Sequence, residues 1–99
     1  MKEELIKRIT ETMVNISKTT NEDSILANGQ DFTIKYDIKN EFIFVSLSNE
    51  DLTDVCYTTY CDTTLYSDVS MYDLECLNDY SLSDLEVICD LLAIINGDL

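Results

Sequence analysis

Histidine is absent from this 99-residue chain, and glycine occurs only twice. Without histidine the chain lacks the commonest general base and metal ligand, so its Ser and Cys side chains have no imidazole to activate them. No nucleophile elbow, Walker loop or dinucleotide fingerprint is present. Carboxylate pairs arise by chance among twenty acids, and no EF-hand loop occurs. We therefore expect no enzymatic activity, no cofactor and no metal site.

Basic residues are few and are confined to the first part of the chain. Residues 1–39 carry all six Lys and Arg against seven acids, a net charge of −1, whereas residues 40–99 carry thirteen acids and no base, a net charge of −13. Repulsion among these carboxylates works against the compact state. Phosphates would repel such a surface, so direct binding of nucleic acid is not expected.

Long apolar runs are also missing. None approaches the roughly 18 residues that cross a bilayer, and the first thirteen residues lack the apolar core of a signal peptide. We therefore expect a cytoplasmic protein without a membrane partner. The four cysteines (Cys56, Cys61, Cys76 and Cys89) lack the C-x2-C pairs of zinc sites, and in a reducing compartment we expect buried free thiols.

Apolar residues at helical spacing predict a helix at each end of the chain. Residues 3–19 form an amphipathic pattern, with an apolar stripe of Leu5, Ile6, Ile9, Met13 and Ile16. Near the C-terminus, Ser83-x-x-Glu86 matches a capping box, and Leu82 with Val87 matches a hydrophobic staple. The helix that follows has an apolar stripe of Leu85, Ile88, Leu92 and Ile95, and Gly97 predicts its end.

The middle of the chain favours strands. Residues 19–30 are polar and predict a loop, with a short turn of helix around Ile25 and Leu26 and a turn signal at Asn28-Gly29. Residues 32–38 alternate as a half-buried strand, and residues 42–47, apolar on both faces, predict a central strand paired with it in a hairpin. Residues 55–60 and 63–66 predict a third and a fourth strand. Residues 67–79 are ambiguous, because Val69, Tyr72 and Cys76 have helical spacing in a short segment.

These elements predict the fold class. A single domain over residues 1–99 with an N-terminal helix, three or four antiparallel strands and a C-terminal helix corresponds to a small two-layer α+β domain. Exposed strand edges would also allow a homodimer.

The base-free half suggests a surface for a basic protein partner. Arg binds both carboxylates and aromatic faces, and Tyr is a common interface anchor. The alternative for the tyrosines is packing in the core. The predicted partner-binding residues are Glu50, Asp51, Asp54, Asp62, Tyr66, Asp68, Tyr72, Asp73, Glu75, Asp79, Tyr80, Asp84 and Glu86.

In size and in the charge pattern of residues 40–99, the chain resembles small acidic nucleic-acid mimics, including phage-encoded inhibitors of restriction and CRISPR systems. No diagnostic motif is shared, so no functional residue carries over. The resemblance implies a non-catalytic inhibitor that blocks the Arg/Lys-rich groove of a nuclease or nucleic-acid-guided effector in a bacterial cytoplasm. Two alternatives remain open: an immunity protein or antitoxin that neutralises a basic toxin, and a scaffold domain whose charge maintains solubility.

Overall fold

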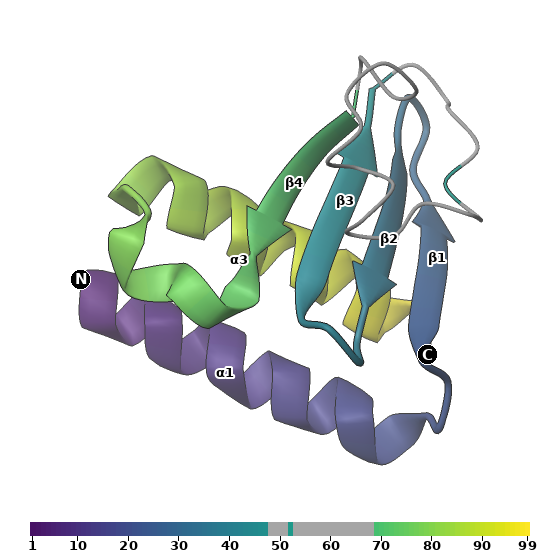
Figure 1. Ribbon diagram of the computed structural model, residues 1–99, viewed down its shortest axis with the longest axis horizontal. Coiled ribbons are helices and arrows are strands. Elements are labelled where there is room, and N and C mark those ends of the chain that lie inside the picture. The colour runs from purple at the N-terminus through teal and green to yellow at the C-terminus, as the bar shows by residue number, and fades with distance from the viewer. Residues whose placement is uncertain (48–51, 53–68) are drawn as a thin grey trace.

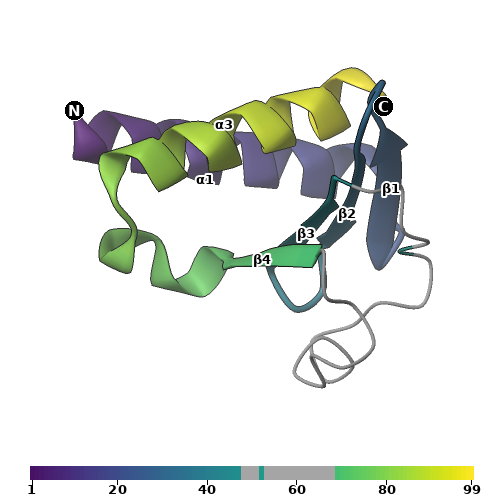
Figure 2. The same cartoon turned by 90° about the horizontal axis from the view of Figure 1, so that it is seen from above.

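Two long helices cover one face of a four-stranded antiparallel sheet in the computed structural model, which describes residues 1–47, 52 and 69–99 (Figures 1 and 2). This arrangement confirms the predicted small α+β domain of two layers. The described elements are α1 (Lys2–Thr19), β1 (Ser24–Asn28), β2 (Thr33–Asp37), β3 (Phe42–Ser46), β4 (Val69–Asp73), the 3-10 helix η1 (Leu74–Asp79) and α3 (Leu82–Gly97).

Helix α1 follows its predicted bounds closely. Ile9 and Ile16 are fully buried, while Leu5, Ile6 and Met13 pack against the main core from the sides of the stripe. Its first turn contains Glu3 and Glu4 and its last turn contains Lys18, and these charges suit the positive and negative ends of the helix dipole. α1 lies against α3, so the two helices form a single layer (Figure 2).

The sheet has the strand order β1-β2-β3-β4, with every neighbouring pair antiparallel. The hairpin of β2 and β3 confirms the prediction, and β3 is central because it pairs with β2 on one side and β4 on the other. The strands predicted over residues 55–60 and 63–66 lie outside the described residues. Among the described residues, β1 and β4 form the two edges.

Strand β1 corrects the prediction of a loop with a helical turn. Ile25 and Ala27 face the main core, whereas Leu26 between them is exposed. The strand forms because its backbone pairs along its whole length with β2, from Ser24 opposite Asp37 to Asn28 opposite Thr33. Such pairing is nonlocal, and five residues are too short for a clear periodic signal.

The turn between β1 and β2 contains the Asn28-Gly29 signal. The Gly29 N–H donates to the Phe32 carbonyl oxygen at 2.9 Å, which closes the turn. Glycine suits the close packing here, because a Cβ at this position would overlap the Phe32 ring and force that side chain to move.

Strand β2 is buried on both faces, which corrects the prediction of a half-buried strand. Lys35 and Asp37 belong to the buried residues although they point away from the helices. A second apolar cluster of Phe42, Phe44, Leu52 and Val69 includes the residues of β3 that pair with Lys35 and Asp37, and Met71 packs against it. The Asp37 carboxylate accepts hydrogen bonds from the main-chain N–H and the side-chain amide of Asn40, at 3.1 and 3.0 Å, within the hairpin turn.

Val69, Tyr72 and Cys76 do not form the helix that their spacing suggests. Val69 and Tyr72 lie in β4 and contribute to opposite faces of the sheet, since Val69 belongs to the second cluster and Tyr72 packs on the main core. Pairing with the central strand β3 decides this outcome over the local pattern. The helical turn begins only after Asp73, as η1.

Helix α3 confirms the predicted stripe, because Leu85, Ile88, Leu92 and Ile95 are fully buried, but its cap is a different serine. Ser81, and not Ser83, is the N-cap, and its hydroxyl accepts the Asp84 N–H at 3.2 Å. The staple of Leu82 and Val87 is also wrong, since both side chains are exposed. Gly97 is the last helical residue, as predicted.

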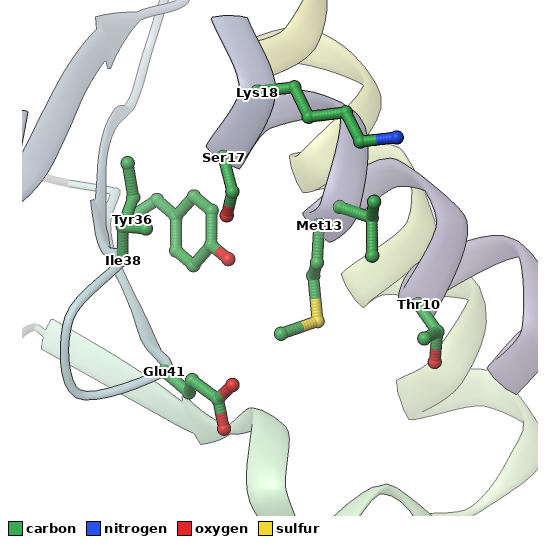
Figure 3. Close-up of a pocket in the computed structure, with 8 residues that line it drawn as sticks. Thr10, Met13, Ser17, Lys18, Tyr36, Ile38 and Glu41 are labelled. Carbon is green, nitrogen blue, oxygen red and sulfur yellow. The ribbon is translucent and has the colours of Figure 1, made fainter. Parts of the chain in front are cut away.

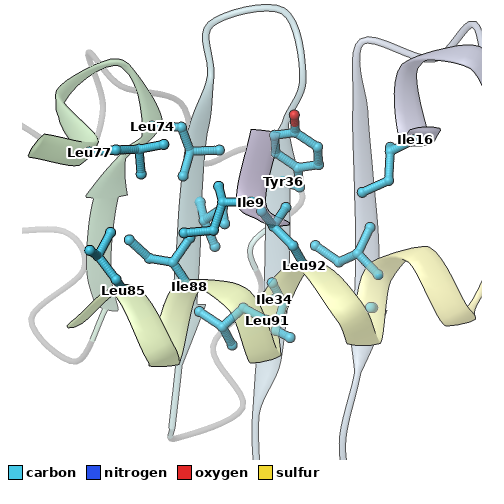
Figure 4. Close-up of a cluster of buried hydrophobic side chains, with 13 residues drawn as sticks. Ile9, Ile16, Ile34, Tyr36, Leu74, Leu77, Leu85, Ile88, Leu91 and Leu92 are labelled. Carbon is cyan, nitrogen blue, oxygen red and sulfur yellow. The ribbon is translucent and has the colours of Figure 1, made fainter. Parts of the chain in front are cut away.

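The main core lies between the sheet and the two helices (Figure 4). Its fully buried members include Ile34, Tyr36 and Ile43 from the sheet, Ile9 and Ile16 from α1, and Leu85, Ile88, Leu92 and Ile95 from α3. Among the cysteines that the structure describes, Cys76 is exposed and Cys89 is half-buried, and both are free thiols. The expectation of buried thiols is therefore wrong for Cys76, which lies on η1. No helix among the described residues combines the length and apolarity that a membrane crossing requires.

Candidate protein-binding surface

The described part of the predicted surface is carried by one continuous stretch of chain, from the end of β4 through η1 to the first turns of α3 (Figure 1). Seven predicted residues fall within it: Tyr72, Asp73, Glu75, Asp79, Tyr80, Asp84 and Glu86. The other six lie outside the described residues: Glu50, Asp51, Asp54, Asp62, Tyr66 and Asp68.

Helix η1 is fixed on its inner side by buried apolar residues and at its N-terminal end by a carboxylate cap. Leu74 and Leu77 are buried in the main core, which leaves Glu75 and Asp79 exposed on the outer side. Asp73 caps η1, because its Oδ1 accepts the Glu75 N–H at 2.9 Å. Its Oδ2 accepts the Cys76 thiol at 3.5 Å. Asp73 is therefore a structural residue as well as a charge.

Four carboxylates act on the same small group of side chains. The pKa of the Cys76 thiol is raised first by its hydrogen bond to Asp73 and by the Asp73 charge, with smaller effects from Asp79 and Glu75. Burial raises the pKa of Tyr80, and the charges of Asp73 and Asp84 raise it further, although the hydrogen bond from the Asp73 main chain lowers it. These four carboxylates therefore produce one negative field, and we call them, with Tyr72 and Tyr80, the acidic surface.

Tyr72 and Tyr80 pack against each other and against the main core, and so anchor the segment that carries the acidic surface. Their rings pack edge to face, with centroids 5.9 Å apart and an interplanar angle of 60°. Both are half-buried against the main core, so core packing accounts for most of each ring. Burial raises the pKa of Tyr72, with a further contribution from the charge of Asp84.

Glu86 does not join this group. It lies on α3 with Asp90, and both charges raise the pKa of the Cys89 thiol after the larger effect of burial, while Arg8 of α1 lowers it. The Cys89 thiol also donates to the Leu5 carbonyl oxygen at 3.7 Å. Glu86 therefore faces the side of α3 that meets α1, where a cation already lies.

A cation from the first half of the chain contacts η1 next to the acidic surface. Lys2 Nζ donates to the main-chain carbonyl oxygen of Asn78 at 2.7 Å, which ties the start of α1 to η1. Residues 69–99 themselves contain no Lys or Arg. Within the described part of the chain, no three Cys, Asp or Glu side chains are arranged to hold a metal ion.

An apolar hollow of about 250 Å³ adjoins the acidic surface at Tyr72, and sequence analysis missed it. Its walls come from the sheet and from α3, and they include Phe32, Val45, Leu47, Val87 and Leu91. Leu47 is 76% exposed and Val87 is 41% exposed. The available signal was Leu47 itself, a large apolar residue directly after a strand. The hollow and the acids together resemble a protein interface, with an apolar centre and a polar rim.

Comparisons of the chain with protein-family models, with characterised proteins and with solved structures find no match.

Proposed function

We propose that this protein is a non-catalytic inhibitor that binds the Arg/Lys-rich nucleic-acid-binding groove of a nuclease or nucleic-acid-guided effector. The observation that carries the proposal is the acidic surface: Asp73, Glu75, Asp79 and Asp84 act on one group of side chains, on a stretch of chain without a basic residue. A partner attracted by these charges must be basic. Proteins that bind nucleic acid carry such basic grooves.

The apolar hollow supports binding to a protein over a role of the charge in solubility alone. Charge speeds association, whereas apolar contacts in a desolvated centre slow dissociation. Val87 lies three residues after Asp84 in α3, so the rim and the hollow share one helix face. The exposed side chains of Leu47 and Val87 at this hollow offer adjoining apolar surface to a protein partner.

The proposed mechanism is competition. Carboxylates take the place of phosphates in the groove, and the nucleic acid is excluded while the protein is bound. The proposed setting is the cytoplasm of a bacterial cell, in which such effectors act. An immunity protein against a basic toxin would use the same surface chemistry, and the identity of the captured partner distinguishes the two.

Affinity capture with a matched pair of variants tests the proposal. The tagged protein is incubated with nuclease-treated bacterial lysate at two salt concentrations, and the bound proteins are identified. The test variant is Glu75→Lys with Asp79→Lys, since both side chains are exposed and neither makes a hydrogen bond to a described residue. The control is Glu11→Lys with Glu22→Lys, which changes the net charge equally on other elements.

We expect one nucleic-acid-binding protein, released at high salt and displaced by added DNA or RNA. We expect the association rate to fall at least tenfold for the test variant and to change little for the control. Equal behaviour of the two variants would mean that total charge, and not the acidic surface, attracts the partner. Capture of a toxin that the protein neutralises would favour the immunity function.

A further inference from the structure

A cavity of about 420 Å³ opens between α1 and the hairpin of β2 and β3 (Figure 3). Its volume lies in the range of ligand sites in proteins, about 300–1,000 Å³. Met13 and Val14 of α1 form one apolar wall, and Ile38 of the hairpin forms another. Tyr36 and Glu41 supply polar atoms, and Lys18 stands at the rim.

The Tyr36 side chain is almost fully buried, but its hydroxyl opens into the cavity. The residue is only 1% exposed, and its ring is part of the main core. Its hydroxyl points into the cavity (Figure 3) and forms no hydrogen bond with any residue that the structure describes. No fully buried side-chain N or O atom among the described residues lacks a partner, so this hydroxyl is the accessible part of Tyr36 and is open to a ligand in the cavity. Burial, followed by the charges of Glu41 and Asp37, raises the Tyr36 pKa to about 12, so the hydroxyl keeps its proton at neutral pH.

Glu41 occupies a backbone position that suits glycine better. Its φ is 61°, in the left-handed region, where a side chain is sterically disfavoured. Glu41 contacts the rest of the fold through its main chain, since its carbonyl oxygen accepts a hydrogen bond from the Leu74 N–H at 2.9 Å. The carboxylate points toward the same space as the Tyr36 hydroxyl (Figure 3). Strained positions of this kind are concentrated at functional sites.

We propose that this cavity binds the side chain of an arginine or lysine presented by a partner protein. The cationic head donates to the Glu41 carboxylate and to the Tyr36 hydroxyl oxygen, and the alkyl stem packs against Met13, Val14 and Ile38. Both basic side chains combine such a stem with a charged head. The Lys18 ammonium points away from Glu41 (Figure 3), so the negative end of the cavity remains accessible to a cation.

The cavity is connected to the acidic surface through the main chain. The hydrogen bond from Leu74 to Glu41 joins the hairpin turn to the start of η1, one residue after Asp73. We accordingly place the cavity and the acidic surface in contact with the same basic partner. The inference rests on the proposed function only in naming a basic partner protein as the source of the Arg or Lys side chain. Binding of such a side chain in the cavity can be tested without that partner.

The test is an NMR titration of the full-length isotope-labelled protein with blocked amino acids at constant ionic strength. N-acetyl-arginine methylamide and N-acetyl-lysine methylamide are the probes, and the norleucine and glutamate analogues are the controls. We expect saturable shifts around Tyr36 and Glu41 with the two cationic probes only. Tyr36→Phe and Glu41→Gln should each weaken binding at least fivefold, whereas Glu22→Gln should leave it unchanged.

Two stability measurements exclude misfolding as the cause. Tyr36→Phe should keep its melting temperature, because the lost hydroxyl has no partner among the described residues. Glu41→Gly should raise the melting temperature, because glycine accepts the left-handed conformation, and it should still lose binding. Equal shifts with norleucine, or full binding by Tyr36→Phe, would overturn the proposal. Successful capture of a basic partner without probe binding would reject the cavity site alone, and the reverse result would reject only the proposed function.

Discussion

The main-chain N–H of Asp73 donates a hydrogen bond of 2.6 Å to the hydroxyl oxygen of Tyr80. This bond joins the last residue of β4 to the residue that follows η1, so it closes the loop that carries Glu75 and Asp79. The same Asp73 caps η1 through its carboxylate. The geometry of the acidic surface therefore depends on the half-buried ring of Tyr80 and its hydroxyl as well as on the Asp73 carboxylate.

Replacement of Tyr80 tests this dependence. Tyr80→Phe keeps the ring and its packing on Tyr72 but leaves the Asp73 N–H without its acceptor. The loss should reduce the free energy of unfolding by about 1 kcal/mol. Tyr72→Phe is the control, because the Tyr72 hydroxyl forms no hydrogen bond to a described residue. Urea unfolding followed by circular dichroism measures both, and an equal effect of the two changes would show that the hydrogen bond contributes nothing.

The N-cap of α3 provides a second pair of matched variants. Ser81→Ala removes the hydroxyl that accepts the Asp84 N–H, and loss of an N-cap serine costs about 1 kcal/mol, within a range of about 0.5–2. Ser83→Ala changes an exposed serine inside the first turn and should have almost no effect. Denaturant midpoints of the two variants measure the difference. A larger effect at Ser83 would place the cap at the serine that the sequence pattern favours.

Alkaline pH should destabilise the fold through Tyr36. In the unfolded chain its phenol loses its proton near pH 10, whereas in the folded protein it keeps the proton until about pH 12 because of burial and the nearby Glu41 and Asp37 charges. The unfolded state therefore binds fewer protons in this window, so stability is complete below pH 10 and falls as the pH rises toward 12. Urea midpoints at pH 9, 10 and 11 should decrease more steeply for the wild type than for Tyr36→Phe. Parallel slopes would mean that Tyr36 ionises as in the unfolded chain.

Salt should stabilise the protein. Its net charge is −14, and salt at about 0.1 M shortens the range of charge repulsion to about 10 Å. If screening relieves about 1 kcal/mol, the melting temperature should rise by about 4–8 °C. The variant Glu75→Lys with Asp79→Lys should respond less, because it has fewer repelling carboxylates on one surface. A melting temperature that falls with added NaCl would indicate that the acids are paired with cations in the native state.

Local patterns were sufficient for the helices and the hairpin. The stripes around Ile9 in α1 and Ile88 in α3 repeat at helical spacing over about three turns, so each helix has one apolar face wherever it packs. Residues 42–46 are apolar on both faces, and this pattern alone predicts a central strand. In these segments the local preference and the tertiary structure agree.

Pairing at a distance decided the other elements. Ser24–Asn28 becomes a strand because β2 offers it a partner, and Val69–Asp73 becomes a strand because β3 does. The choice of Ser81 over Ser83 follows from where the chain leaves η1, since Tyr80 packs on the main core just before the helix begins. The local sequence of these segments does not show which strand will pair with them or how the chain enters α3.

The acidity of residues 40–99, with no basic residue to neutralise it, follows from composition and needs no fold. Which of the described carboxylates act together depends on how the chain folds. The fold places the Asp84 charge near Tyr72 and Tyr80 and the Glu86 charge, two residues later, near Cys89, because residues two apart on a helix point in different directions. Folding also brings Tyr36 and Glu41 to one cavity, because they lie on the two sides of a hairpin turn. The remaining wall of that cavity comes from α1, which is distant in sequence.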